Sequence, residues 1–273
     1  DGAAEWIADR YDQVHLLLNE TNEGFAAGYN KAIAACSQPF VLILNTDVFL
    51  APDFIEVTLA ALAEYPEAGA ATGSVFQQGT GEWLNSGFFL RPQMRTEHSA
   101  NLDRAEAVFG CSGALILFRR EMLEDIRIEG QYFDEAYFSY GEDIDLAWRA
   151  QLLGWQARFT PGAKAHHVGS GSSDERLRFV DKPAFLQRHL LKNRYLTLVK
   201  NTSTGVLPYV LLPFILAEPL VWLYLLLRLP WRFPYLLLAL ADTCRHLPTA
   251  LRWRRQLMRR QRVSAAYIRQ FLR

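Results

Sequence analysis

The sequence is poor in cysteine and contains no internal repeat or low-complexity tract. Its three cysteines, Cys36, Cys111 and Cys244, are far apart and show no C-x-x-C or other metal-ligand spacing. This usage argues against a cysteine metal centre and is typical of a reducing compartment. We therefore expect the three cysteines to be small core residues.

We expect no secretory signal at the start of this sequence, because its first dozen residues are acidic and contain no long apolar run. It does not begin with methionine, which we interpret as the sign of a piece of a longer protein. Half of its 273 residues are hydrophobic and 13% are aromatic, so the chain has enough apolar material for a substantial core. This composition argues against disorder and fits one large domain, or one medium domain with an appendage.

Acidic residues are scarce at the C-terminal end. Residues 1–190 contain 27 Asp and Glu against 15 Lys and Arg, whereas residues 191–273 contain 2 against 14. A formal net charge of zero therefore hides two electrostatically different parts. We predict one domain over 1–190 and a basic, apolar, helical region over 191–273.

Strand and helix patterns alternate along the first part of the chain, which is typical of an α/β sheet. We predict strands at 15–18, 40–44, 70–76, 83–91, 114–118 and 156–160, the last stopped by Pro161-Gly162. We predict helices at 5–11, 28–35, 52–65, 120–126 and 144–153.

The run VLILNTDVFL places a carboxylate, Asp47, at the end of a buried strand. Ligands of open α/β sheets gather at this edge, and such a carboxylate can hold Mg²⁺ or Mn²⁺ that bridges to substrate phosphates. The alternative is that Asp47 only caps a turn before a helix that opens at Pro52.

Three acids, Glu142, Asp143 and Asp145, begin the predicted helix of YGEDIDLAWR. They can complement the helix dipole, and Asp145 can pair with Arg149 four residues later. This explanation suits Asp145 better than the adjacent Glu142 and Asp143, whose like charges repel unless a positive ligand or a proton is near.

The segment AHHVGSGSS offers two histidines and a loop of small polar residues. His166 and His167 are possible metal ligands, and the loop can supply amides and hydroxyls to phosphate oxygens. The alternative is a plain flexible turn.

Together these segments resemble the inverting glycosyltransferases of family 2, and within them the rhamnosyltransferase-like branch. The resemblance extends from the first residue to about Asn201. It is carried by five segments in order: NETNEGFAAGYNKAI, VLILNTDVFLAPDF, FGCSGALILFRREMLEDI, FDEAYFSYGEDIDLAWRAQLLGW and AHHVGSGSS.

The resemblance implies a GT-A fold, in which a mixed α/β sheet flanked by helices binds a nucleotide-sugar at its strand ends. It implies that Asp47 is the last acid of the metal-binding Asp-x-Asp motif, in which Asn45 takes the place of the first Asp. It also implies that His166 contacts the metal or the diphosphate, with His167 as the fallback. It makes Asp143 the general base for the acceptor hydroxyl and Glu142 a positioning group.

The segment around the first helix resembles the part of the family that lines the nucleotide and diphosphate. Asn22, Gly24, Gly28 and Asn30 are the donor contacts that it implies, together with Asn45. The alternative is a helix-start loop in which Asn acts as a cap. We expect a dTDP-rhamnose donor, with UDP- and GDP-sugars open, and a lipid-linked glycan acceptor in bacterial cell-surface synthesis.

The start of the chain departs from the family pattern. Asp1-Gly2 resembles only the end of an Asp-Asn-x-Ser-x-Asp-Gly motif that grips the base and ribose. We therefore expect the first β-α units of the fold to be missing from this sequence.

Between Lys200 and Arg228 the only charged residue is Glu218, and basic residues flank this apolar run on both sides. We expect helices broken at Pro208, Pro213 and Pro219 that lie in the cytoplasmic leaflet of the cell membrane; a transmembrane hairpin is the alternative. Interleaved Leu and Trp favour a membrane surface over nucleic acid as the partner of the basic run.

Two other functions remain open at the level of sequence. A sugar nucleotidyltransferase would also use a strand-end Asp and a metal, but the chain lacks the basic Gly-rich phosphate loop that such an enzyme needs. A noncatalytic, membrane-bound sugar or lipid-carrier binding module is the other alternative.

Overall fold

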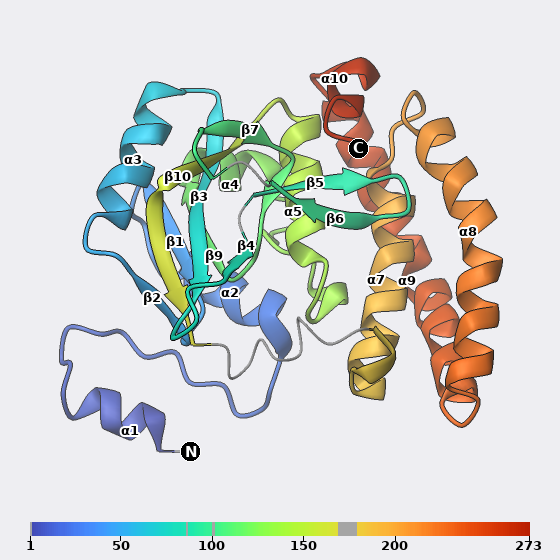
Figure 1. The fold of residues 1–273 in the computed structure, drawn as a ribbon, viewed down its shortest axis with the longest axis horizontal. Helices are drawn as coiled ribbons and strands as arrows, with labels where there is room; N and C mark the ends of the chain where they lie inside the picture. Colours follow the sequence, from blue (N-terminus) through green and yellow to red (C-terminus); the bar gives the residue numbers. More distant parts are fainter. Residues whose placement is uncertain (1, 86, 100–101, 169–178) are drawn as a thin grey trace.

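The computed structural model describes residues 2–85, 87–99, 102–168 and 179–273. Within these ranges the centre is a seven-stranded mixed sheet with the order β1-β9-β3-β10-β2, to which β4 adds at β3 and β7 at β10 (Figure 1). Its strands are β1 (Phe40–Leu44), β2 (Val48–Leu50), β3 (Ala68–Gln77), β4 (Trp83–Asn85), β7 (Glu106–Val108), β9 (Leu115–Arg119) and β10 (Gln156–His167). A smaller sheet contains β5 (Gly87–Arg91), β6 (Arg95–His98) and β8 (Gly110–Cys111).

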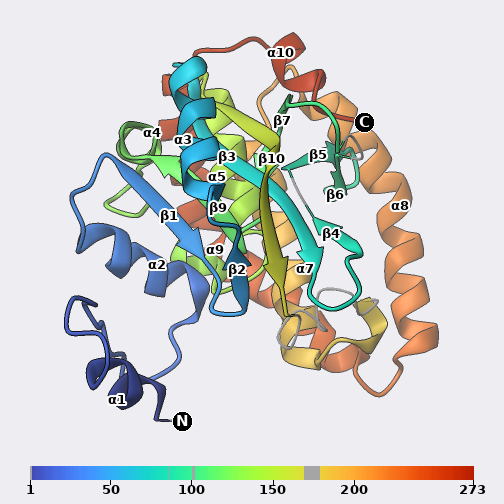
Figure 2. The same ribbon diagram turned by 60° about the vertical axis from the view of Figure 1, so that its left-hand side comes forward.

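Helices cover both faces of the large sheet and extend beyond it. They are α1 (Ala3–Ala8), α2 (Gly24–Ala34), α3 (Phe54–Glu64), α4 (Arg120–Ile126), α5 (Glu142–Leu152), α7 (Ala184–Asn201), α8 (Leu207–Arg228), α9 (Phe233–Arg260) and α10 (Ala265–Arg269), with short 3-10 helices η1 (Glu135–Tyr137) and η2 (Phe179–Asp181). Figures 1 and 2 show α1 apart from the sheet and α7, α8 and α9 gathered at the opposite side of the molecule.

The two faces of β3 have different partners because successive strand residues point to opposite sides. Ala71 packs in a cluster with Leu62 of α3. Its neighbour Ala70 belongs to the largest core cluster, together with Met122 of α4 and Trp148 of α5. The site-bearing helix α5 is therefore fixed by burial against one face of the sheet.

Two predictions about the strands are wrong. Residues 15–18 form no strand: they pair with no neighbouring strand, and the side chains of Leu17 and Leu18 are 46% and 74% exposed. Pro161-Gly162 does not stop the last strand, because β10 bulges there and its register with β3 shifts between Thr160 and Lys164. Gly73 makes room for the bulge, since a Cβ at this position would lie 2.0 Å from the carbonyl oxygen of Ala163.

The C-terminal helices are longer than expected. α8 runs as one helix through Pro213 and Pro219, with Pro208 in its first turn, and α9 continues from Phe233 to Arg260. The expected breaks at these prolines are therefore wrong. A proline in the first turn removes no helical hydrogen bond, and an interior proline can kink a helix without ending it.

The apolar α8 is also the only helix in the described residues that is long and apolar enough to cross a membrane, by length and composition. Only 17% of its most apolar window is buried within the protein. The predicted division at residues 190 and 191 falls inside α7, which spans Ala184–Asn201 and packs against α5.

Candidate active site

A cleft of about 1570 Å³ lies where β1 and β10 end. Its walls come from the β1–β2 turn, the turn before β9, the start of α5, β6, and helices α7 and α8. Among the residues predicted from sequence, Asn45, Asp47, Glu142, Asp143 and the fallback His167 line this cleft. The structure therefore brings the two acidic motifs into one cavity.

Asp143 is held by backbone amides rather than by a cation. The Gly113 N–H donates to its Oδ2 at 3.1 Å, and the Ile144 N–H donates to its Oδ1 at 2.8 Å. Burial raises the pKa of Asp143, while these amide hydrogen bonds and the nearby His98 act in the opposite direction. Such a carboxylate holds a proton more readily than an exposed aspartate does.

Asp47 faces a histidine across the end of β10. Its Oδ2 lies 2.9 Å from Nε2 of His167, and the His167 side chain is only 3% exposed. The Val168 N–H donates to the Asp47 carbonyl oxygen at 2.9 Å, which ties this turn to the strand end. The cleft thus contains a carboxylate and an imidazole side by side.

His166, the first choice for the metal contact, points away from this pair. Because β10 remains a strand beyond the bulge, consecutive side chains alternate, and His166 is exposed while His167 is buried at the cleft. The ring of His166 lies 6.1 Å from that of Phe76. The loop residues of the same motif, Gly169, Ser172 and Ser173, lie outside the described residues.

The predicted donor contacts around α2 perform structural tasks. Asn22 Oδ1 accepts a hydrogen bond from the Gly24 N–H at 2.9 Å, which forms a turn just before the helix, whose N-cap residue is Glu23. Gly24 has a φ of 82°, and a Cβ there would lie 2.5 Å from the Phe138 carbonyl oxygen. Asn22, Gly24 and Gly28 are not among the described residues that line the cleft.

Asn30 is a buried clamp between α2 and the segment before η1. Its Oδ1 accepts from the backbone N–H groups of Tyr132 and Phe133, and its Nδ2 donates to the Phe133 carbonyl and to Glu135 Oε1. These bonds occupy the side chain, and Asn30 is not among the described residues that line the cleft.

The loop that leads into α5 has an unusual backbone. Phe138 and Tyr140 have φ values of 63° and 69°, and Gly141 at the helix start has 87°. Asn193 of α7 holds this loop, because its Nδ2 donates to the carbonyls of Tyr137, Ser139 and Tyr140. Non-glycine residues with positive φ persist only where their surroundings fix them, so α7 supports the position of the α5 acids.

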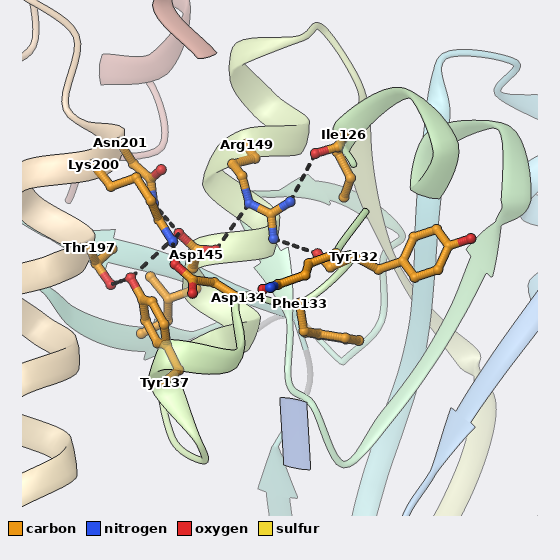
Figure 3. Close-up of polar contacts among 12 residues, drawn as sticks. Ile126, Tyr132, Phe133, Asp134, Tyr137, Asp145, Arg149, Thr197, Lys200 and Asn201 are labelled. Atoms are coloured by element: carbon orange, nitrogen blue, oxygen red, sulfur yellow. Dashed lines mark hydrogen bonds and ion pairs between the residues drawn. The ribbon is translucent and has the colours of Figure 1, made fainter. Parts of the chain in front are cut away.

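Behind the cleft, Asp145 enters a buried network that Figure 3 shows. Arg149 Nε donates to Asp145 at 3.0 Å, as the spacing of the two residues predicts, and Lys200 Nζ lies 2.8 Å from the same carboxylate. Lys200 also pairs with Asp134, and Asn201 donates to Asp145 at 2.7 Å. Lys200 and Arg149 lower the pKa of Asp145 despite its burial.

Several residues that line the cleft were not predicted from the sequence. Phe25 and Tyr29 of α2 line the cleft with ring centroids 4.3 Å apart, and the Tyr29 hydroxyl donates to the Leu44 carbonyl at 3.2 Å. Their spacing of four residues on a helix is the signal that could have found them. Lys182 and Arg194 also line the cleft, but their place in the fold depends on α7 and gives no such signal.

Comparisons with known proteins place the chain in a family. The sequence profile described as "Glycosyltransferase like family 2" matches residues 3–184. An N-acetylglucosaminyl-diphospho-decaprenol L-rhamnosyltransferase of Mycobacterium tuberculosis is 28% identical over 203 residues, covering 62% of this chain and 65% of that protein. A pre-mycofactocin glycosyltransferase of the same species is 29% identical over 164 residues, covering 56% of this chain and 32% of that protein.

Two solved structures share the fold. GalNAc-T7, crystallised with UDP, GalNAc and Mn²⁺, has a TM-score of 0.55 and 13% identity over 72% of this chain and 38% of its own. Staphylococcus aureus TarS 1-349 in complex with UDP-GlcNAc has a TM-score of 0.52 and 15% identity over 94% of this chain and 80% of its own. The predicted mixed sheet of the GT-A type is confirmed by the structure and these likenesses.

Proposed function

The chain belongs to glycosyltransferase family 2, and from that premise we propose that it transfers a sugar from a nucleotide-diphosphate donor to a hydroxyl group of a lipid-linked acceptor, with inversion. One observation carries the proposal: Asp143 and the Asp47–His167 pair line the same cleft. The chain spans 65% of the length of the rhamnosyltransferase that it resembles, so we extend the activity of that relative to this chain as a proposal.

We assign the role of general base to Asp143. Attack by a sugar hydroxyl requires a carboxylate that accepts the proton as the new bond forms. The two backbone amides fix both carboxylate oxygens of Asp143, and the pKa raised by burial increases its affinity for that proton. Glu142, buried and adjacent in the cleft, positions the acceptor or the base. One displacement of this kind inverts the anomeric centre.

We assign the donor diphosphate to the Asp47 side of the cleft. A carboxylate oxygen and an imidazole nitrogen are a donor set that Mn²⁺ accepts, with phosphate oxygens and water completing its coordination. The described residues contain no cluster of three or more such side chains, so Asp47 and His167 would hold the ion together with the donor. When bound, Mn²⁺ or Mg²⁺ would stabilise the charge of the leaving nucleoside diphosphate.

We favour dTDP-rhamnose as the donor because of the similarity to the rhamnosyltransferase, and keep UDP- and GDP-sugars as alternatives. The exposed apolar α8 and the basic residues that flank it favour action at the cytoplasmic face of the cell membrane.

The test is release of nucleoside diphosphate from a panel of dTDP-, UDP- and GDP-sugars, with Mn²⁺ and a polyprenyl-diphosphate sugar. One donor should turn over, and Asp47→Asn should remove most of that turnover. The matched control is Asp53→Asn, because Asp53 flanks α3 and is not among the described residues that line the cleft. Donor binding without release by the unaltered chain would contradict the enzyme and favour a binding module.

A further inference from the structure

The cleft has two walls of different chemistry. One wall, from the β1–β2 turn and α5, carries the carboxylates of Asp47, Glu142 and Asp143. The other wall, from η2, α7 and α8, carries the cations Lys182 and Arg194 and a set of apolar residues. Pockets for one ligand usually have volumes of roughly 300–1,000 Å³, so a cleft of about 1570 Å³ has room for a second ligand beside the donor.

The cations of this second wall are fixed in place. Lys182 is 7% exposed, and its ammonium group lies 5.6 Å from the centroid of the Tyr140 ring, which also lines the cleft. Arg194 forms an ion pair with Glu218, and its guanidinium lies 4.5 Å from the Phe214 ring centroid. Among the described residues, the buried Nε of Arg194 has no hydrogen-bond partner.

The apolar part of the wall continues out of the cleft. Leu220 and Tyr224 of α8 both line the cleft, yet they are 67% and 48% exposed. Next to them on the same helix, Leu216, Leu223 and Leu227 are 66%, 51% and 71% exposed. An exposed apolar stripe of this extent is typical of contact with lipid. It forms a path from the outer face of α8 to the cations.

We propose that this second wall, made by Lys182, Arg194, Leu220 and Tyr224, is the binding site for a polyprenyl diphosphate, the lipid carrier of the acceptor sugar. The inference rests on the proposed function and names the substrate class for that site. Lys182 and Arg194 bind the diphosphate, Leu220 and Tyr224 contact the first isoprene units, and the chain continues along α8 into the membrane. The sugar on the diphosphate then lies in the same cleft as Asp143.

Binding of geranylgeranyl diphosphate to the full chain in phosphatidylcholine nanodiscs, measured by calorimetry, tests this site. Lys182→Met should weaken the affinity about 10-fold to 100-fold, the range expected for one lost charge-assisted hydrogen bond. Lys182→Arg should retain most of the affinity, because it keeps the charge. Equal affinity in the unaltered chain and Lys182→Met would overturn the proposal.

The lipid contact is tested separately from the cation, with two exposed leucines of α8. Leu220→Ser should weaken geranylgeranyl diphosphate about fivefold, while Leu226→Ser, exposed but not among the described cleft residues, should not. Equal losses in both would indicate a general effect on membrane contact and overturn the site. The same measurement in nanodiscs of the anionic lipid phosphatidylglycerol should still show binding of geranylgeranyl diphosphate. Loss of that binding would also overturn the proposal, because it would show that Lys182 and Arg194 bind lipid headgroups instead.

Failure of this site differs from failure of the proposed function. Binding of the nucleoside diphosphate with Mn²⁺ should depend on Asp47 and stay unchanged in Lys182→Met. If Asp47→Asn loses nucleotide binding while all variants bind geranylgeranyl diphosphate alike, the lipid site is wrong and the donor site stands.

Discussion

Two aspartates at the start of α5, one on the cleft side and one on the buried side, have pKa values that are shifted in opposite directions. Asp143 faces the cleft, receives two backbone N–H groups and has a raised pKa. Asp145, two residues later, is fully buried with Lys200 and Arg149, which lower its pKa. The first arrangement keeps a carboxylate ready to take up a proton, and the second keeps a carboxylate charged to lower pH.

This difference shows how one helix start serves two purposes. The buried network joins α5 to α7 through charges that balance, with Asp134 and Asp145 against Lys200 and Arg149 (Figure 3). Removal of one partner from the pairs around Asp145 should therefore cost stability, whereas we expect the chemistry to reside in Asp143.

The largest effect is expected from Asp143→Asn. If Asp143 is the general base, turnover should fall about 10²-fold to 10⁴-fold. Thermal unfolding should change little, because the loss of a charge that burial disfavours offsets the loss of the acceptor for one of the two backbone N–H groups. The measurement is single-donor turnover together with calorimetric unfolding, and unchanged turnover would remove Asp143 from the role of base.

Breaking the buried network should cost stability instead. Lys200→Met leaves Asp134 and Asp145 short of a cation, and breaking a buried pair in this way costs about 3–5 kcal/mol. The matched control is Lys31→Met, which removes an exposed pair with Glu23 and should cost only about 0–1 kcal/mol. Denaturant unfolding measures both, and equal values would show that burial does not distinguish the two pairs.

A smaller effect should follow when the link from α7 to the α5 loop is cut. Asn193→Ala leaves three carbonyls without their donor, which should cost about 1–3 kcal/mol of stability. It should also lower kcat more than it raises the donor KM, because the α5 acids lose support while the Asp47 side is untouched. The control is Asn19→Ala, which changes an exposed side chain. An unchanged kcat in Asn193→Ala would show that α7 does not hold the loop in its active position.

The smallest effect concerns pH. Folding raises the pKa of Asp143, so the native state binds its proton more tightly than the unfolded state, and the ionised form weakens stability at neutral pH. The free energy of unfolding of the unaltered chain should therefore rise relative to that of Asp143→Asn as the pH falls from the raised pKa to the unfolded pKa, by about 1.4 kcal/mol for each pH unit that separates the two pKa values. Unfolding at a series of pH values measures this, and a constant difference would contradict the raised pKa.

Asp145 behaves in the opposite sense. Its lowered pKa means that its contribution to stability is present above its unfolded pKa of about 3.9 and is lost as the pH falls through the lower folded value. The test compares the free energy of unfolding of the unaltered chain with that of Asp145→Asn over a pH series, because this difference isolates Asp145 from the other titrating groups. The difference should begin to shrink only below about pH 3.9, and a difference that shrinks well above that pH would contradict an ionised Asp145.

Local patterns predicted much of the fold. The helix 120–126 is observed with the same bounds, and the strand 40–44 likewise, because their apolar periodicity and neighbouring turns are local properties. The strand that continues through Pro161-Gly162 was missed because its bulge is accommodated by Gly73 on a neighbouring strand. The resemblance to the family favoured His166, but the continuation of β10 to His167 decides which histidine faces Asp47.

The sequence by itself determined the acidic motifs, their order along the chain and the division of charge between its two ends. These features depend only on residue type and spacing. The tertiary structure alone decided that Asn30 is a structural clamp, that His167 lies beside Asp47, and that Lys182 and Arg194 line the same cleft as the acids. The physical reason is that side-chain direction, burial and charge pairing are set by contacts between segments far apart in sequence, which no local pattern contains.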